Sequence, residues 1–247
     1  MRGKTPENTV PVQVSTLNQV VAVAGGGAHA LALKADGTVW AWGYNSNGQT
    51  GDNRAGSITT VPVEVSALSR AMAIAAGGAH SLAVKSDGTV WAWGSNQYGQ
   101  LGNGSNEDSS APVQVPGLVN VIRVAGGDHY SLALKSDGTV WAWGINREGE
   151  LGNGTNTETN VPVWVSGLSG VIAISAAPAV GPNHSLALKA DGTVWAWGYN
   201  ASSQLGNGGN TDSNVPIQVP GIRGAIAIAA GGAHSVAILA TPEGRAR

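Results

Sequence analysis

Histidine recurs at one position of a repeated segment, and an array of imidazoles could bind a metal ion or an anion. In the third repeat the aligned residue is Tyr130, with His129 one residue earlier. No carboxylate pair recurs beside these positions, so the spacing supplies no oxygen ligands. A histidine beside a Gly-Gly turn more often bonds a backbone carbonyl, as a tyrosine would also do. We therefore expect no bound metal and a structural role for His29, His80, Tyr130, His184 and His234.

Other patterns that could support catalysis or ion binding are weaker. Gly-Asn-Gly-x-Asn loops occur at 102–106, 152–156 and 206–210, but acidic residues do not follow them at the fixed spacing that a calcium loop requires. Serine, histidine and aspartate are plentiful, yet the sequence has no Gly-x-Ser-x-Gly, no Walker loop and no His-Glu-x-x-His helix. We expect no catalytic residue, no enzyme activity and no cofactor.

The elements that position these side chains follow from a repeated octapeptide, Asp-Gly-Thr-Val-Trp-Ala-Trp-Gly. It occurs four times unchanged, in steps of 51, 50 and 54 residues, starting at Asp36, Asp87, Asp137 and Asp191. Around each copy the same segments recur: Val-Pro-Val-x-Val, a small apolar run into Gly-Gly-x-His-Ser-Leu-Ala-Leu-Lys, and Gly-x-Asn-x-x-Gly-Gln-Leu-Gly-Asn-Gly. A fixed period of this length indicates an array of one structural unit.

Within one unit the hydrophobic pattern is that of short strands. Two alternating runs flank each Asp-Gly pair, which predicts a hairpin. The apolar run 71–75 ends at two glycines and predicts another strand. The segment 61–65 contains Pro62, and proline restricts it to an outer strand. Four short strands in each unit of about 50 residues predict the blade of a β-propeller.

The two tryptophans of each octapeptide are two residues apart, so their side chains leave the same face of the strand. Small alanine and glycine residues face the other way, which lets successive blades nest against each other. We expect blade packing to be the role of all eight, which are Trp40, Trp42, Trp91, Trp93, Trp141, Trp143, Trp195 and Trp197.

The segments 75–85 and 93–104 resemble the repeat of the regulator of chromosome condensation family of β-propellers. The resemblance covers nearly the whole chain, and the near identity of its four repeats favours a bacterial member. The family includes a nucleotide exchange factor for a small nuclear GTPase, a plant ultraviolet-B photoreceptor and, more distantly, a bacterial β-lactamase inhibitor. The resemblance implies protein binding by faces and loops, with no shared catalytic centre.

We predict an all-β chain with a single propeller domain over 1–247 and about five four-stranded blades, at 20–65, 71–115, 121–165, 171–219 and 225–239 plus 10–14. The last blade is incomplete, because Thr-Pro-Glu-Gly-Arg-Ala-Arg stands where the fifth octapeptide is expected. Either residues 10–14 add an outer strand to this blade and close the ring, or the ring stays open with an edge for another chain. Members of the family typically close seven blades, so oligomerisation, strand exchange or truncation would each explain the deficit.

Composition limits the partners. The chain has 42% hydrophobic residues, 11% charged residues, a net charge of -2 and no cysteine, so it has material for a core and no attraction for a polyanion. Residues 1–9 lack a secretory apolar stretch, and no run approaches the roughly 20 apolar residues of a membrane span. We expect a cytoplasmic protein, or a secreted one if a leader was removed. Its expected partner is another protein, with no nucleic acid and no membrane, and a homo-oligomer through the last blade is an alternative.

Function is expected where one repeat differs from the others. Trp164 stands where the other repeats have glutamine or glutamate, either as an anchor for a partner or as an isolated exposed side chain. Arg123 replaces an alanine, either as a ligand contact in the channel or as a solvated charge. The turns after the octapeptides vary and form the best candidate binding surface, with Tyr44, Tyr98, Arg147, Glu148 and Tyr199. The insertion 176–180, with Pro178 and Val180, predicts a raised loop.

These features favour a non-enzymatic interaction module that acts as a scaffold or as an inhibitor of another protein. One alternative is a guanine-nucleotide exchange regulator of a small GTPase, which would need an acidic wedge, whereas the acidity here is weak and scattered. Another alternative is a small-molecule or glycan binder at the channel or at Tyr44, Tyr98 and Tyr199. A photoreceptor would require tryptophans grouped with arginines outside the repeat pattern, and only Trp164 lies outside it.

Overall fold

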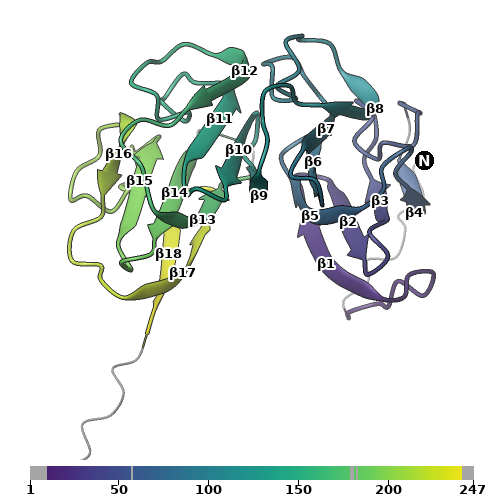
Figure 1. The fold of residues 1–247 in the computed structure, drawn as a ribbon, viewed down its shortest axis with the longest axis horizontal. Coiled ribbons are helices and arrows are strands. Elements are labelled where there is room, and N and C mark those ends of the chain that lie inside the picture. Colours follow the sequence, from purple (N-terminus) through teal and green to yellow (C-terminus); the bar gives the residue numbers. More distant parts are fainter. Residues whose placement is uncertain (1–9, 57, 179–180, 182, 241–247) are drawn as a thin grey trace, which may run out of the picture.

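Eighteen strands form an arc of five antiparallel sheets in a computed structural model that describes residues 10–56, 58–178, 181 and 183–240 (Figure 1). The first sheet holds β1 (Val20–Gly25), β2 (His29–Lys34), β3 (Val39–Gly43) and β4 (Thr59–Glu64). The second holds β5 (Ala71–Ala76), β6 (His80–Lys85), β7 (Val90–Gly94) and β8 (Ser109–Gln114). The third holds β9 (Val121–Gly126), β10 (Tyr130–Lys135), β11 (Val140–Gly144) and β12 (Thr159–Trp164). The fourth holds β13 (Val171–Ala176), β14 (His184–Lys189), β15 (Val194–Gly198) and β16 (Ser213–Gln218), and the last holds β17 (Ala225–Ala230) and β18 (Ser235–Leu239).

The strands of each sheet pair in the order of the sequence, from the inside of the arc to its rim. The first strands β5, β9, β13 and β17 adjoin one another along the inner side. The proline-containing strands β4, β8, β12 and β16 lie at the outer edge, as expected, because an edge strand tolerates a residue without an N–H. The all-β blade architecture predicted from the repeat is therefore present.

The Asp-Gly pair makes the hairpin between the second and third strands of each complete sheet. In the second sheet, Gly88 has a φ of +77°, which a residue without Cβ adopts at little cost. The Asp87 carboxylate accepts hydrogen bonds from the Thr89 hydroxyl, at 2.6 Å, and from the Thr89 N–H, at 3.0 Å. These bonds lower the pKa of Asp87. The first residues of the octapeptide thus form the hairpin turn.

The second tryptophan of the octapeptide packs one sheet onto the preceding one. Trp143 is fully buried, and its Nε1 donates to the backbone carbonyl of Gln100 at 2.8 Å. Its ring covers Gly102, where a Cβ would lie 2.7 Å from Nε1. Trp93 and Trp197 make the same bond to Gln49 and Glu150. Each complete sheet is therefore joined to its neighbour by a buried indole.

Histidine and serine form a second tie between sheets. His80 Nε2 lies 2.9 Å from Ser131 Oγ, and that hydroxyl donates to the Gln100 carbonyl at 2.8 Å. The serine proton is therefore committed, so Nε2 is the donor of the imidazole. Burial lowers the pKa of His80 to about 3 and keeps the ring neutral. The same contact recurs in the pairs His29–Ser81 and His184–Ser235.

Tyr130 replaces histidine in the third repeat and makes an equivalent tie. Its hydroxyl donates to the His184 carbonyl at 2.7 Å and accepts from Ser185 at 3.0 Å. The partners of the three buried histidines are thus serines of the next repeat, where the sequence pattern predicted backbone carbonyls. His234 is exposed, because no further sheet follows the last one among the described residues.

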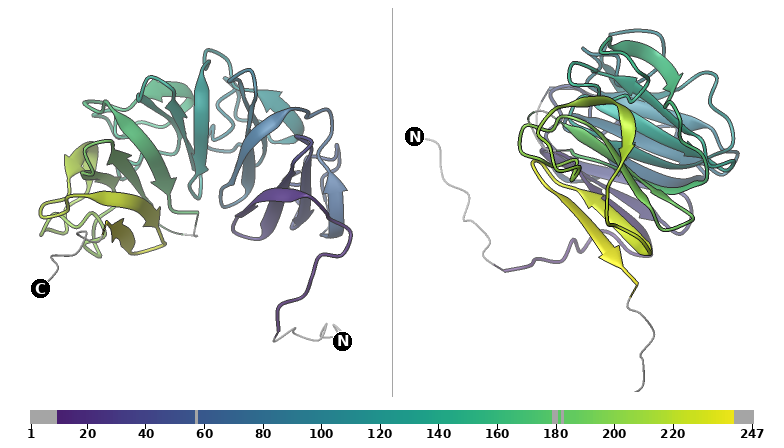
Figure 2. Two further views of the ribbon diagram at one scale, coloured as in Figure 1. Left: turned by 60° about the horizontal axis from the view of Figure 1, so that its bottom comes forward. Right: turned by 90° about the vertical axis from the view of Figure 1, so that its left-hand side faces the viewer.

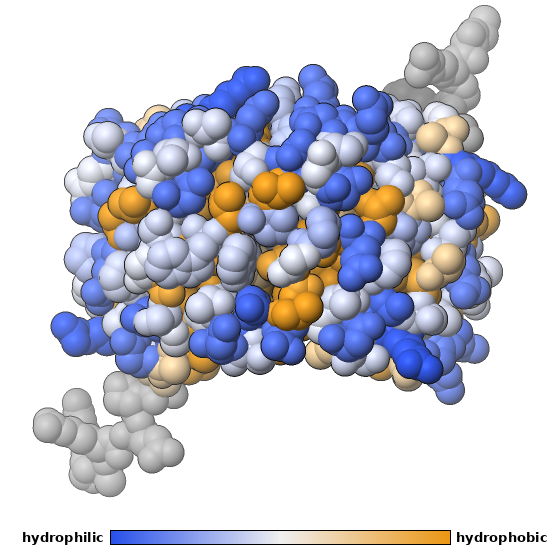
Figure 3. All heavy atoms as spheres, turned by 45° about the horizontal axis from the view of Figure 1, so that its top comes forward, coloured by the Kyte–Doolittle hydropathy of each residue, from blue (hydrophilic) through white to orange (hydrophobic). Residues whose placement is uncertain are grey.

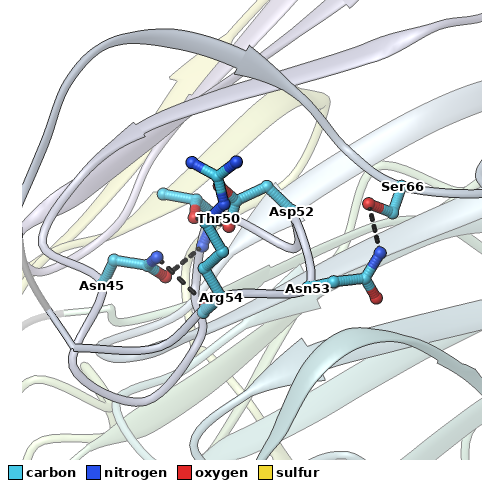
Figure 4. A network of polar contacts seen from close by, with 6 residues as sticks. All are labelled: Asn45, Thr50, Asp52, Asn53, Arg54 and Ser66. Carbon is cyan, nitrogen blue, oxygen red and sulfur yellow. Dashed lines mark hydrogen bonds and ion pairs between the residues drawn. The ribbon is translucent and has the colours of Figure 1, made fainter.

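An invariant asparagine holds the long loop after each octapeptide. In the first repeat, shown in Figure 4, Asn45 accepts from the Thr50 N–H at 3.0 Å and donates to the Arg54 carbonyl at 3.1 Å. Farther along the same loop, Asn53 donates to Ser66 Oγ at 2.8 Å. These bonds fix the loops that carry the variable residues.

Among the described residues the sheets do not close into a ring. Residues 10–14 form no strand, and β17 and β18 form a two-stranded sheet, so of the two alternatives the closure by residues 10–14 is wrong. Val10 and Val12 are 66% and 64% exposed and belong to no sheet. Figure 2 shows β1 and the last sheet at opposite ends of the arc. No helix among the described residues is long and apolar enough to cross a membrane.

Candidate functional site

A hollow of about 210 Å³ lies where turns of the second, third and fourth repeats meet. Tyr130 opens β10 opposite Gly144, which ends β11, so antiparallel pairing brings the turns before β10 and after β11 to one edge of the sheet. We call this site the third-repeat hollow. It is lined by Tyr98, Asp128, His129, Ile145, Arg147, Glu148, Glu150, Gly181 and Asn183.

One wall of the third-repeat hollow is an aromatic and cationic stack. The rings of Tyr98 and His129 are 4.9 Å apart between centroids and tilted by 42°. The Arg147 guanidinium carbon lies 5.5 Å from the centroid of the Tyr98 ring, within the range of a cation–π contact. Arg147 is exposed and Tyr98 half-buried, so the stack can be reached from solvent.

Asp128 lies beside His129 and, with Glu148 and Glu150, forms what we call the acidic wall of the hollow. Its side chain is 9% exposed, and Oδ2 lies 3.5 Å from His129 Nε2. The same oxygen accepts the Gly181 N–H at 3.3 Å. The aligned residues of the first two repeats are glycines, Gly27 and Gly78, so the carboxylate is specific to the third repeat.

Glu150 is the second buried acid of the third-repeat hollow. It is 1% exposed, and its Oε2 accepts the Glu148 N–H at 3.0 Å. The other complete repeats have glutamine here, and Gln100 makes the same bond to the Tyr98 N–H at 3.0 Å. Burial, and after it the neighbouring Glu148 carboxyl, raise the pKa of Glu150 to about 8. The site therefore holds an acid that changes its charge just above neutral pH.

Asn183 adds an acceptor without a partner. It is 3% exposed, and its amide nitrogen donates to the Gly181 carbonyl. Its Oδ1 has no hydrogen-bond partner among the described residues, although it is buried. The third-repeat hollow thus holds a buried acceptor that a hydrogen-bond donor of a ligand could satisfy. No cluster of three ligand side chains fit to hold a metal ion occurs in the described ranges.

The remaining candidate residues are spread over the arc. Trp164 ends β12, is 48% exposed and lies opposite Trp141 on the neighbouring strand. Arg123 is exposed on β9, the inner strand of the third sheet. Tyr44 is exposed after β3, and Tyr199 is half-buried after β15. Of the predicted residues, the structure gathers Tyr98, Arg147 and Glu148 in one hollow, whereas the tyrosines 44, 98 and 199 belong to three different sheets.

The insertion at 176–180, predicted as a raised loop, is described only over its first three residues. Ala176 ends β13 and is buried, and Ala177 is fully buried, so neither of these two residues is raised above the surface. Pro178 is half-buried. Val180 lies outside the described residues.

Comparison with known proteins shows the family of this chain. The sequence profile of the RCC1-like domain matches residues 2–237. The chain belongs to the RCC1-like domain family. This agrees with the resemblance carried by its repeat motifs.

Relatives of this RCC1-like chain are longer. It is 29% identical to the ultraviolet-B receptor of Arabidopsis thaliana over 96% of this chain and 55% of the receptor. It is 35% identical to the probable E3 ubiquitin-protein ligase HERC6 of Homo sapiens over 96% of this chain and 19% of the ligase. The structure of Prp20p from Saccharomyces cerevisiae has a TM-score of 0.77 and 26% identity, over 88% of this chain and 55% of that one. The chain thus spans about half the length of the receptor and of Prp20p.

In this RCC1-like chain, sequence analysis did not single out Asp128, Glu150 or Asn183 as site residues, and it noted His129 only as the neighbour of Tyr130. The signal was present, since each departs from the aligned residues of the other repeats, as Trp164 and Arg123 do. The repeat pattern does not show that Asp128, Glu148 and Glu150 line one hollow. These residues come from two turns that a hairpin separates in the sequence, so only the fold brings them together.

Proposed function

We propose that the chain is a non-enzymatic protein-binding scaffold and that the third-repeat hollow is its docking site. The observation that carries the proposal is that four residues that differ from their counterparts in the other repeats surround one accessible hollow. These residues are Asp128, His129, Arg147 and Glu150. Residues shared by all repeats hold the arc together, so the repeated packing does not require the charged groups of these unshared residues. Loops on a rigid scaffold are a frequent place for recognition.

The charges favour a basic side chain of the partner. Asp128 and Glu148 supply carboxylates, whereas Glu150, whose pKa is raised to about 8, supplies a carboxyl group that is mostly uncharged at neutral pH. Asn183 supplies a carbonyl oxygen that has no partner among the described residues. Arg147 lies over the Tyr98 ring. A lysine or arginine could therefore donate to the acidic wall while its stem contacts the aromatic wall.

On the face of the molecule seen in Figure 3, apolar side chains lie between polar ones. Prp20p, described with its binding to Gsp1p and histones, is a protein-binding relative of similar fold. That likeness supports binding of a protein and does not favour guanine-nucleotide exchange over docking, since the third-repeat hollow provides acceptors for a cation rather than a defined wedge.

Site-specific photo-crosslinking tests the proposal. A photoreactive phenylalanine analogue is placed at Tyr98 and, as a control, at Ser202, the exposed residue at the same position of the fourth repeat. The chain is then irradiated in a lysate of its source cells. A discrete protein adduct from position 98 and not from position 202 is the expected result.

The adduct must then be shown to depend on the hollow. The captured protein is purified and titrated against the chain and against Asp128→Asn and Glu148→Gln variants. We expect at least about 10-fold weaker binding for each, the effect of losing one well-placed polar contact. Equal adducts at both positions, or unchanged affinities, would refute docking at the third-repeat hollow.

A further inference from the structure

Glu150 brings to the third-repeat hollow a chemical property that the fold does not use. The aligned residues of the other complete repeats are glutamines, and the side-chain oxygen of each accepts a backbone N–H at 2.9–3.0 Å; they are Gln49, Gln100 and Gln204. Glu150 makes the same bond through Oε2, at 3.0 Å. A glutamine would therefore serve this turn equally well. The ability of Glu150 to bind and release a proton is an addition to the repeat.

The turn that holds Glu150 also places a second carboxyl on the hollow. Glu148 is half-buried, whereas Glu150 is 1% exposed, and both line the same space. Two neighbouring carboxyls do not both ionise readily when one of them is removed from water. Burial, and after it the Glu148 carboxyl, raise the pKa of Glu150 to about 8. Without a partner, Glu150 therefore keeps its proton at neutral pH.

Among the described residues, no cation of the chain is paired with Glu150. Arg147 comes from the same turn, but its guanidinium lies over the Tyr98 ring, and it forms no ion pair in the described part of the chain. On the turn before β10, Asp128 Oδ2 lies 3.5 Å from His129 Nε2. An ionised Glu150 would thus lack a direct counter-charge.

The elements packed behind Glu150 supply no charge either. Tyr130 on β10 and His184 on β14 are titratable, but burial raises the pKa of the tyrosine and lowers that of the histidine to about 4, so both are neutral near pH 7. The fourth-repeat segment 177–183 has no charged residue. It does supply Asn183, which is 3% exposed and whose Oδ1 has no partner among the described residues. A cationic hydrogen-bond donor would satisfy this acceptor and balance the acidic wall together.

We infer that the third-repeat hollow is a proton-exchanging site, in which docking of a lysine or arginine head group of the partner drives the proton of Glu150 into solvent. The O–H bond of the Glu150 carboxyl breaks, the proton passes to water, and the carboxylate that remains faces the bound cation. The inference rests on the proposed docking of a basic side chain and adds its regulation, because a partner bound in this way binds more tightly as the pH rises.

The linkage between the two events sets the size of the effect. A cation within a few ångströms lowers the pKa of a carboxyl by roughly one to three units. Binding and proton release affect each other equally, so a fall of about one unit in the pKa of Glu150 corresponds to about tenfold tighter binding at high pH than at low pH. The affinity rises between the pKa of the bound form and that of the free form, which is about 8.

NMR of the intact chain measures the proton directly. The probe is n-butylammonium, which has the charge and much of the stem of a lysine side chain and, like lysine, stays protonated to about pH 10. The chain is isotopically labelled at its glutamate carboxyl carbons, and the Glu150 signal is identified by its absence from the Glu150→Gln variant. We expect its titration midpoint to lie at least about one pH unit lower with saturating butylammonium than with sodium chloride at the same ionic strength.

Two carboxyl variants provide a matched comparison of affinity for the same probe at about pH 6 and about pH 9. Glu150→Gln keeps the acceptor of the turn but has no proton to release, and Glu158→Gln removes an exposed carboxyl that does not line the hollow. We expect about tenfold tighter binding at the higher pH for the wild type and for Glu158→Gln. Most of that change should be lost in Glu150→Gln. His129 is present in all three proteins, so any dependence that Glu150→Gln keeps belongs to another group such as this imidazole.

Two results would overturn the inference. One is that butylammonium shifts the side-chain amide signal of Asn183 while the Glu150 midpoint stays where sodium chloride leaves it. The other is that Glu150→Gln keeps the full pH dependence of the wild type. If the probe shifts neither signal, the hollow accepts no cation, and the proposed docking of a basic side chain fails together with the inference. The response of Asn183 therefore separates the two failures.

Discussion

Replacing Glu150 with glutamine should remove a loss of stability that this chain otherwise undergoes as the pH rises from 5 to 9. Burial raises the pKa of Glu150 to about 8, well above that of an ordinary glutamate. A carboxyl with a raised pKa in the folded state stabilises the fold fully below its unfolded pKa, and that stability is lost as the pH rises through the folded pKa. Glutamine carries no such charge and provides the same acceptor, as Gln100 does for the Tyr98 N–H.

The size of the effect follows from the shift. Between the unfolded and the folded pKa, each pH unit lowers the stability by about 1.4 kcal/mol, and the interval from pH 5 to the folded pKa of about 8 gives an upper value near 4 kcal/mol. We therefore expect a loss on the order of 2 to 4 kcal/mol in the wild type from pH 5 to pH 9, relative to Glu150→Gln.

Urea unfolding followed by tryptophan fluorescence at pH 5, 7 and 9 measures this difference. The exposed Glu158→Gln serves as the charge-matched control and should follow the wild type. Parallel pH profiles for wild type and Glu150→Gln would refute the assignment of a raised pKa to this carboxyl.

Three further predictions concern the ties between sheets. Trp143→Ala should lower the free energy of unfolding by about 3–5 kcal/mol, because it removes a fully buried indole and its bond to Gln100. Trp164→Ala should lower it by less than about 1 kcal/mol, since Trp164 is half exposed. Denaturant titration of both variants measures this difference. Gly102→Ala should destabilise the fold more than Gly104→Ala, since only the first Cβ would clash with Trp143, and a difference in melting temperature checks this. A double-mutant cycle of His80→Ala and Ser131→Ala should give a coupling energy of about 1 kcal/mol, and strict additivity would show that their contact contributes nothing.

Much of the fold could be predicted from the repeat. The Asp-Gly turn, the edge strand marked by Pro62 and the shared face of Trp91 and Trp93 are consequences of local sequence, and the structure contains all three. Closure of the ring was not predictable in the same way. It depends on how far each sheet rotates against the next, which is set by many packing contacts and not by one motif.

The candidate site was only partly predictable. Tyr98, Arg147 and Glu148 stood out because they vary between repeats, and all three line the third-repeat hollow. Trp164 stood out for the same reason and lies elsewhere, on the rim. Sequence variation shows which residues the repeat does not require, but only the packing of neighbouring turns shows which of them meet.

The central claim is that the acidic wall of the third-repeat hollow receives a basic side chain of a protein partner. The most direct test is the dissociation constant, by isothermal titration calorimetry, of the protein captured through position 98. We predict roughly 30-fold weaker binding to the Asp128→Asn, Glu148→Gln double variant, as for loss of a hot-spot contact, and no change for Glu158→Gln. An affinity that the double variant leaves intact would contradict the account.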